Sequence, residues 1–218
     1  MTRYILLIAM TAMGFLNCPA QASFQEALAK TFIAFDTTQD YQKKVDASNK
    51  IGLIAKKWNT EWSTHYYNAY AKCVLSYMDK DEAKRDAYVD EADRELDEAI
   101  SLLGKESDET HVLKAMLANA RMAVKPQARW QKYGKVFDEN LEKAKELNAD
   151  TPRIYYLKGT SKFFTPKMFG GGKDAALPYF EKADGLYAKE SNADITKPYW
   201  GKEANTYFIT ECKKEDKK

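Results

Sequence analysis

Apolar residues recur at intervals of three and four along most of the chain, with charged residues between them. In the stretch 92–103, for example, Ala92, Leu96, Ala99 and Leu103 fall on one face of a helix, and acidic residues occupy the other faces. No run of alternating polar and apolar residues is long enough to predict a sheet. The pattern therefore predicts an all-α fold.

Short breaks rich in Gly, Pro, Asp, Asn or Thr divide this pattern into about nine helices of roughly 12 to 22 residues. The breaks fall at 36–38, 58–59, 79–81, 104–107, 125–126, 149–152, 165–172 and 192–198. Two kinds of helix start are recognisable. Ser107 precedes Asp108 and Glu109, and such residues favour the positive end of a helix. Pro152 and Pro198 suit a first helical position, where the missing N–H of proline costs nothing.

Three of the expected helices share one internal pattern. A small or aromatic residue is followed four positions later by a large apolar residue, and three positions after that by alanine. The three instances are Ala92-Leu96-Ala99, Phe137-Leu141-Ala144 and Ala176-Phe180-Ala183. Alanine in a contact stripe lets a neighbouring helix approach closely, and each of these helices follows another amphipathic helix. We therefore expect antiparallel hairpins that stack on one another.

This pattern resembles the second-helix signature of tetratricopeptide repeats. Residues 144–150 look like the end of such a repeat, and residues 153–159 look like the opening of the next, with Gly159 at the small crossing position. The resemblance covers roughly 59–214 and departs from the ~34-residue period by added length. It implies a right-handed superhelix of stacked helical hairpins, with 23–58 as a degenerate first hairpin and a terminal capping helix that opens at Pro198.

The first 22 residues have the layout of a cleavable secretory signal. Arg3 precedes a short apolar run, and small residues end the segment at Ala20 and Ala22. The apolar run is shorter than the ~20 residues that a membrane anchor needs. A lipoprotein signal at Cys18 is the other alternative, although the residue before it, Asn17, is not small. We expect cleavage after Ala22, a periplasmic or secreted product, and one domain over 23–218.

The composition does not point to a particular class of binding partner. The formal net charge of +2 predicts no binding to nucleic acid and no insertion into membranes after signal cleavage. Two cysteines remain after cleavage, Cys73 and Cys212, and we expect no disulfide between them because pairing requires close and specific geometry. Cys73, between Ala71 and Val74, is typical of a buried small apolar residue.

The sequence contains no constellation that indicates catalysis, a metal site or a cofactor. Neither His65 nor His111 lies in a metal-ligating spacing, and the carboxylates alternate with lysines on exposed helix faces. The segment Gly170-Gly171-Gly172-Lys173 lacks the preceding strand and the following Ser or Thr of a phosphate loop. It is expected to be a flexible connection, or else an anion-binding helix start.

Aromatic residues cluster in the expected first helices of the hairpins, where they either pack in the core or face the groove. Tyr and Trp offer large rigid contact areas with a polar tip, which suits ligand or peptide capture. The residues expected to point into the groove are His111, Asn119, Arg153, Tyr156, Thr160 and Phe163.

We therefore expect a non-catalytic exported scaffold that binds a protein or peptide partner in its concave groove. The alternative is a periplasmic accessory protein that binds a small organic ligand for a solute transporter. That alternative follows from residues 168–183, which are similar to a segment of the periplasmic repeat protein associated with TRAP-type transporters.

Overall fold

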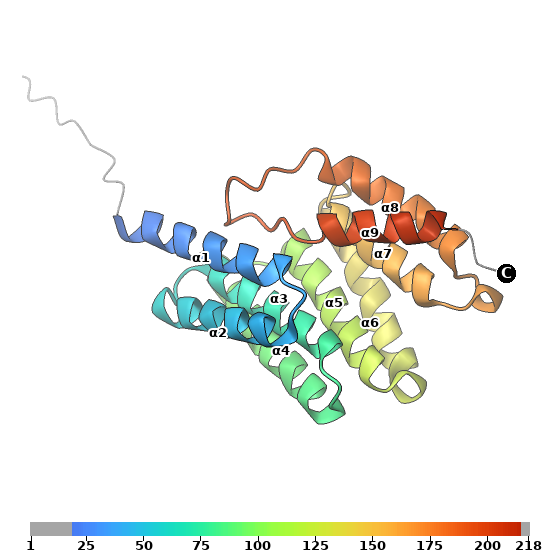
Figure 1. Cartoon of the computed structure of the whole chain (residues 1–218), viewed down its shortest axis with the longest axis horizontal. Helices are drawn as coiled ribbons and strands as arrows, with labels where there is room; N and C mark the ends of the chain where they lie inside the picture. The colour runs from blue at the N-terminus through green and yellow to red at the C-terminus, as the bar shows by residue number, and fades with distance from the viewer. Residues whose placement is uncertain (1–18, 215–218) are drawn as a thin grey trace, which may run out of the picture.

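The computed structural model describes residues 19–214, and within this range the chain forms nine α-helices, one 3₁₀ turn and no strand (Figure 1). The elements are α1 Pro19–Thr37, α2 Tyr41–Lys57, α3 Trp62–Met78, α4 Glu82–Leu103, α5 Asp108–Val124, α6 Pro126–Leu147, α7 Pro152–Phe164, η1 Lys167–Phe169, α8 Lys173–Tyr187 and α9 Lys202–Lys213. The all-α prediction is confirmed. Most of the predicted signal segment, Cys18 included, lies outside the described residues. No helix of residues 19–214 is both long enough and apolar enough to cross a membrane.

Successive helices form antiparallel hairpins, and the hairpins stack. The most extensive contacts join α3 with α4, α5 with α6 and α7 with α8, and α1 packs on α2. The odd-numbered helices α1, α3, α5 and α7 also contact one another in order, so they share one surface, here called the inner face. A single cluster of buried apolar side chains runs from Phe24 in α1 to Trp200 before α9.

The alanine-bearing triplets lie at the contacts that hold these hairpins together. Every member of the three triplets is buried, and Ala92, Ala99, Ala144, Ala176 and Ala183 are wholly inaccessible to solvent. The small crossing position of the last hairpin is equally tight. A Cβ atom on Gly159 would lie 2.6 Å from the ring of Phe180, so α7 and α8 approach closely only because this side chain is absent.

Helix boundaries follow local chemistry at most positions. Ser107 and Thr110 form a reciprocal capping box at the start of α5, and Pro152 occupies the first turn of α7. The expected helix start at Pro198 is wrong, because α9 begins at Lys202 after Gly201, whose φ of 98° is left-handed. Pro198 is instead buried in the segment that precedes the helix.

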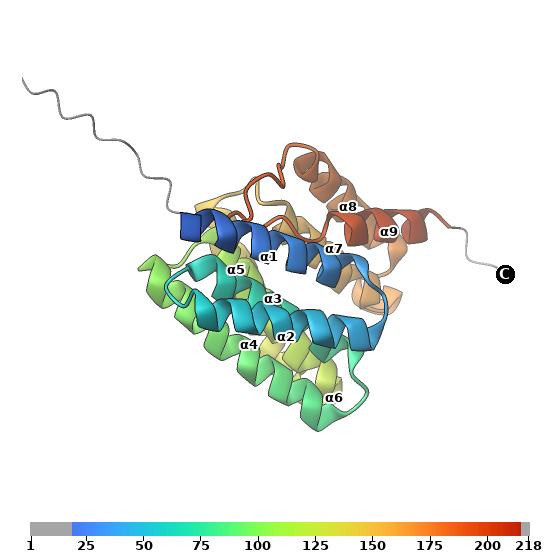
Figure 2. The ribbon, with the colours of Figure 1, turned by 60° about the vertical axis from the view of Figure 1, so that its left-hand side comes forward.

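The segment between α8 and α9, residues 188–201, is here called the strap. Figures 1 and 2 show it running from the end of α8 toward α1 and then turning back to α9. The hydroxyl of Tyr67 in α3 donates to the carbonyl of Lys197 at 3.2 Å, and the hydroxyl of Tyr187 in α8 donates to the carbonyl of Trp200 at 3.2 Å. The strap therefore ties the last hairpin to the early helices.

Candidate functional site

The strap covers part of the inner face that the sequence predicts as a binding groove. The indole N–H of Trp200 donates to the hydroxyl of Tyr66 at 2.9 Å, and its ring stacks on Tyr70 at 4.7 Å between centroids. Tyr199 packs edge-on against Phe32 of α1 at 5.4 Å. Tyr66, Tyr67 and Tyr70 of α3 are therefore in contact with the chain's own strap and belong to the core.

Arg153, which the sequence places in the groove, lies inside the protein and is only 2% exposed. Its guanidinium donates to the carboxylate of Glu109 from α5, to that of Glu190 from the strap at 2.6 Å, and to the carbonyl of Trp200 at 3.3 Å. The hydroxyl of Tyr66 donates to the same Glu109 carboxylate at 3.3 Å. Burial raises the pKa of Glu109, and the adjacent guanidinium opposes that shift. The network joins α3, α5, α7 and the strap.

Two other predicted groove residues make contacts with neighbouring segments of the chain. The ring nitrogens of His111, which is buried, lie 2.9 Å from Asn140 Oδ1 and 3.2 Å from Glu106 Oε2. Asn119 is half-buried, and its side-chain oxygen accepts from Tyr77 at 3.3 Å. Ligand binding by these residues stays a prediction, because each already has protein partners.

Tyr156, Thr160 and Phe163 lie further along α7 and remain partly accessible. The hydroxyl of Thr160 donates to the carbonyl of Leu157 at 2.9 Å within its own helix. Tyr156 and Phe163 both meet the ring of Phe208 in α9, at 6.3 and 5.1 Å between centroids. The structure therefore brings Tyr156 and Phe163, two of the six predicted groove residues, together against α9. From the sequence, that helix was expected only to cap the stack.

The glycine-rich segment forms the turn from α7 through η1 into α8. Gly170 and Gly172 have positive φ, at 77° and 98°, which explains why glycine stands there. The amide of Gly170 donates to Lys167, that of Gly171 to Pro166 and that of Gly172 to Lys162. All three glycine amides thus have backbone partners, in the turn or in the last part of α7. Anion binding at this segment stays a prediction, and these amides do not contribute to it.

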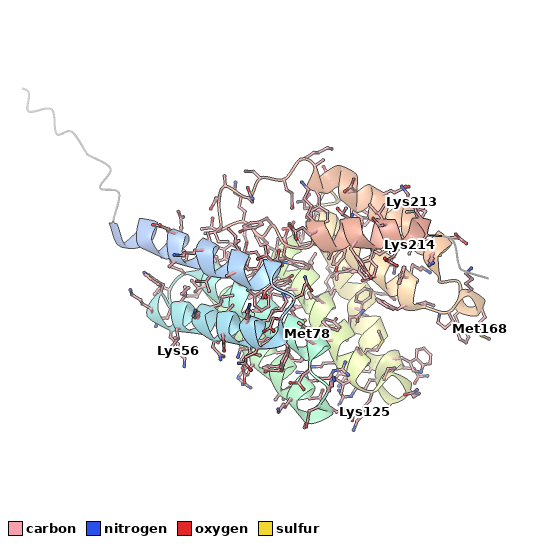
Figure 3. The ribbon with its side chains drawn as sticks, viewed as in Figure 1. Lys56, Met78, Lys125, Met168, Lys213 and Lys214 are labelled. Atoms are coloured by element: carbon pink, nitrogen blue, oxygen red, sulfur yellow. The ribbon has the colours of Figure 1, made fainter. Side chains whose placement is uncertain are left out.

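Beside this turn lies an exposed apolar surface, here called the aromatic patch. Its members are Phe163 and Phe164 of α7, Met168 and Phe169 of η1, and Tyr207 and Phe208 of α9. The rings of Phe163, Phe164 and Phe208 lie within 6.0 Å of one another in each pair, and Tyr207 lies 5.5 Å from Phe208. Four members are more than half exposed, and Met168 is 82% exposed at the outer end of the turn (Figure 3). Exposed apolar side chains that gather on one part of a surface mark interaction sites.

Lysines stand close to the aromatic patch. Lys213 and Lys214 at the end of α9 are exposed and pair with Glu181 at 3.0 Å and with Glu211. The ammonium of Lys162 approaches the carbonyl of Gly170 at 3.4 Å. Phe164, Met168, Phe169, Tyr207 and Phe208 were not predicted as site residues. The sequence does contain one indication of this site, because Tyr207 and Phe208 are adjacent aromatic residues in a charged terminal helix.

The other side chains suited to chemistry have structural roles. The ring nitrogens of His65 lie 2.7 Å from Glu95 Oε2 and 3.3 Å from the carbonyl of Asn59, and the hydrogen bond with Glu95 raises the pKa of the imidazole. Cys73 and Cys212 are both free in the structure, and complete burial raises the pKa of the Cys73 thiol. Within residues 19–214, no group of three or more His, Cys, Asp or Glu side chains is arranged to hold a metal ion.

The described part of the surface includes a cleft at the strap and another at the first hairpin. One, of about 250 Å³, lies between the end of α1 and the strap and includes Asp36, Glu190 and Glu203, and burial raises the pKa of the Asp36 carboxyl. The other, of about 360 Å³, lies between α1 and α2.

Comparisons with known proteins give a match among solved structures. No family model matches the chain, and neither does any curated protein, so the tetratricopeptide assignment stays a prediction. Among solved structures, the HusA haemophore from Porphyromonas gingivalis is similar to this chain with a TM-score of 0.73 and 31% sequence identity. The match covers 92% of this chain and 96% of the haemophore. At that identity and coverage, the chain belongs to the same family as the HusA haemophore.

Proposed function

We propose that this protein is an exported, non-catalytic binding protein that captures haem or a similar flat, anionic, aromatic molecule on the aromatic patch. The observation that carries the proposal is the 31% identity, over nearly the whole chain, to a protein named as a haemophore. Export rests on the signal-like pattern of residues 1–22. The ligand is therefore a small organic molecule and not a protein or peptide partner.

The chemistry of the aromatic patch supports this ligand class. Phe164, Tyr207 and Phe208 present rings that pack against planar conjugated molecules by stacked or edge contacts. Haem carries carboxylates on one edge, and the ammonium groups of Lys213 and Lys214 lie at the adjoining end of α9. Side chains of both kinds are needed to hold an amphipathic ring at a protein surface.

A non-catalytic role agrees with the placement of the reactive side chains. The ring nitrogens of His65 and His111 are engaged by protein partners, and burial keeps the Cys73 thiol protonated. These groups stabilise the helix stack, and the ligand is bound by the exposed aromatic patch instead.

Titration of the purified protein with haem tests the proposal. Binding should appear as a shift of the haem Soret band and as quenching of tryptophan fluorescence. Replacing Phe164 and Tyr207 together by serine should weaken affinity at least tenfold, because exposed aromatic anchors dominate such contacts. Both residues are more than half exposed, so the fold should tolerate the change.

Leu147→Ser is the matched control, because Leu147 is an equally exposed apolar residue at the end of α6. It should bind haem as the unmodified protein does. Absence of haem binding by the unmodified protein would refute the ligand class. Unchanged affinity of the Phe164→Ser, Tyr207→Ser variant would refute the patch as the site.

A further inference from the structure

The cleft between α1 and α2 is a groove with an apolar base and a basic rim. Residues from both helices line it: Lys30, Thr31, Ala34, Thr38, Lys43, Asp46, Ala47 and Lys50. Ala47 is buried and its methyl group forms the base of the groove, whereas Ala34 is exposed and its methyl group forms one wall. The two alanines leave a space of about 360 Å³ where larger side chains would fill it.

The charges around this groove are unbalanced. Lys30, Lys43 and Lys50 face one acidic residue, Asp46, whose carboxylate accepts from Gln42 at 3.0 Å. None of the three ammonium groups has a hydrogen-bond or ion-pair partner among residues 24–214. Unpaired cations beside an apolar groove complement a ligand that is anionic at one end.

Lys44, the neighbouring lysine of α2, behaves differently. It is buried, and its ammonium donates to the carbonyl of Phe35 at 2.6 Å at the end of α1. That lysine caps a helix, as cations near a helix C-terminus do. Among the described residues, the ammonium groups of the three groove lysines cap no helix.

The groove is long enough for an extended ligand. Along α1 it extends from Lys30 to Thr38, which is about 12 Å at 1.5 Å per residue. A linear hydrocarbon chain can lie along a cleft of this length, over the alanine methyl groups.

We propose that the groove between α1 and α2 binds a free long-chain carboxylate. The helices are antiparallel and joined at residues 38–40, so Lys30 and Lys50 lie at the end of the groove away from the turn. The carboxylate lies between these two ammonium groups, and the chain runs over Ala47 toward Thr38. This site is separate from the aromatic patch, and the inference does not depend on haem binding.

Isothermal titration with dodecanoate below its micellar concentration tests the proposal, with dodecanol as the uncharged probe. The full chain should bind the carboxylate, and the alcohol should bind at least tenfold more weakly. Lys30→Gln and Lys50→Gln should each weaken dodecanoate binding about threefold to fivefold. Lys43→Gln, near the turn, should have little effect. Lys105→Gln, an exposed lysine between α4 and α5, is the control.

Blocking the groove gives a test that does not depend on charge. Ala34→Leu should place a larger side chain in the groove and abolish dodecanoate binding. Ala87→Leu, at an exposed position of α4, should leave dodecanoate binding unchanged. Haem titration should be unchanged in all these variants, so failure here is distinguishable from failure of the haem proposal.

Three outcomes would overturn the proposal. These are no dodecanoate binding by the full chain, equal binding of the alcohol, and full binding by Ala34→Leu. Co-sedimentation with phosphatidylglycerol vesicles that persists in Ala34→Leu, with no binding of free dodecanoate, would assign the lysines to a membrane surface instead.

Discussion

Arg153 of α7 joins α5 and the strap through one buried guanidinium. Its guanidinium is 2% exposed and lies between the carboxylates of Glu109 and Glu190. Arg153→Met keeps much of the volume but leaves the Glu109 and Glu190 carboxylates, which are 13% and 24% exposed, without their counter-ion. We expect a loss of about 3–5 kcal/mol in the free energy of unfolding, measured by urea denaturation.

The exposed pair of Lys158 and Asp138 provides the control for that measurement. Its ammonium and carboxylate lie 2.6 Å apart on the surface between α6 and α7. Lys158→Met should change stability little, because water screens such pairs. If Arg153→Met proved as stable as the unmodified protein, the buried network would have no role in holding the strap.

At the scale of elements, α7 and α8 cross closely at Gly159. A methyl group there would lie 2.6 Å from the ring of Phe180, which is itself wholly buried. Gly159→Ala should therefore lower the free energy of unfolding by about 1–3 kcal/mol despite the better helix propensity of alanine. Gly185→Ala on α8 meets no atom within 4 Å and should raise stability by about 0.4–1 kcal/mol. Thermal denaturation of the two variants should give opposite signs, and equal signs would contradict the close crossing.

The helices could be predicted from the sequence because their signals are local. Apolar spacing, the Ser107 cap and the alanine triplets all act within a few residues, and each appears in the structure as expected. The strap could not be predicted, since its contacts join residues far apart, such as Trp200 and Tyr66, 134 positions away. The site was predicted in part for the same reason. Phe163 follows from its helix, whereas its partner Phe208 follows only from how α9 folds back.

At the scale of the molecule, the strap distinguishes this protein from an open stack of repeats. In an open stack each unit contacts only its neighbours, so stability spreads along the array and segments can unfold separately. Here Tyr199 and Trp200 contact helices α1 and α3 near the other end of the chain. We infer that these contacts couple the two ends of the stack into one cooperative unit.

Trp200→Ala tests this coupling. Trp200 is among the largest fully buried side chains, and removing its ring should cost about 3–5 kcal/mol. Far-UV circular dichroism should give one urea midpoint in the unmodified protein, matching the midpoint from tryptophan fluorescence. In Trp200→Ala the strap loses its contacts with Tyr66 and Tyr70, so amides of α9 should exchange hydrogen faster than those of α4, and the two midpoints should separate. Coincident midpoints and uniform exchange in the variant would show that the hairpins stay coupled through their direct contacts alone, without help from the strap.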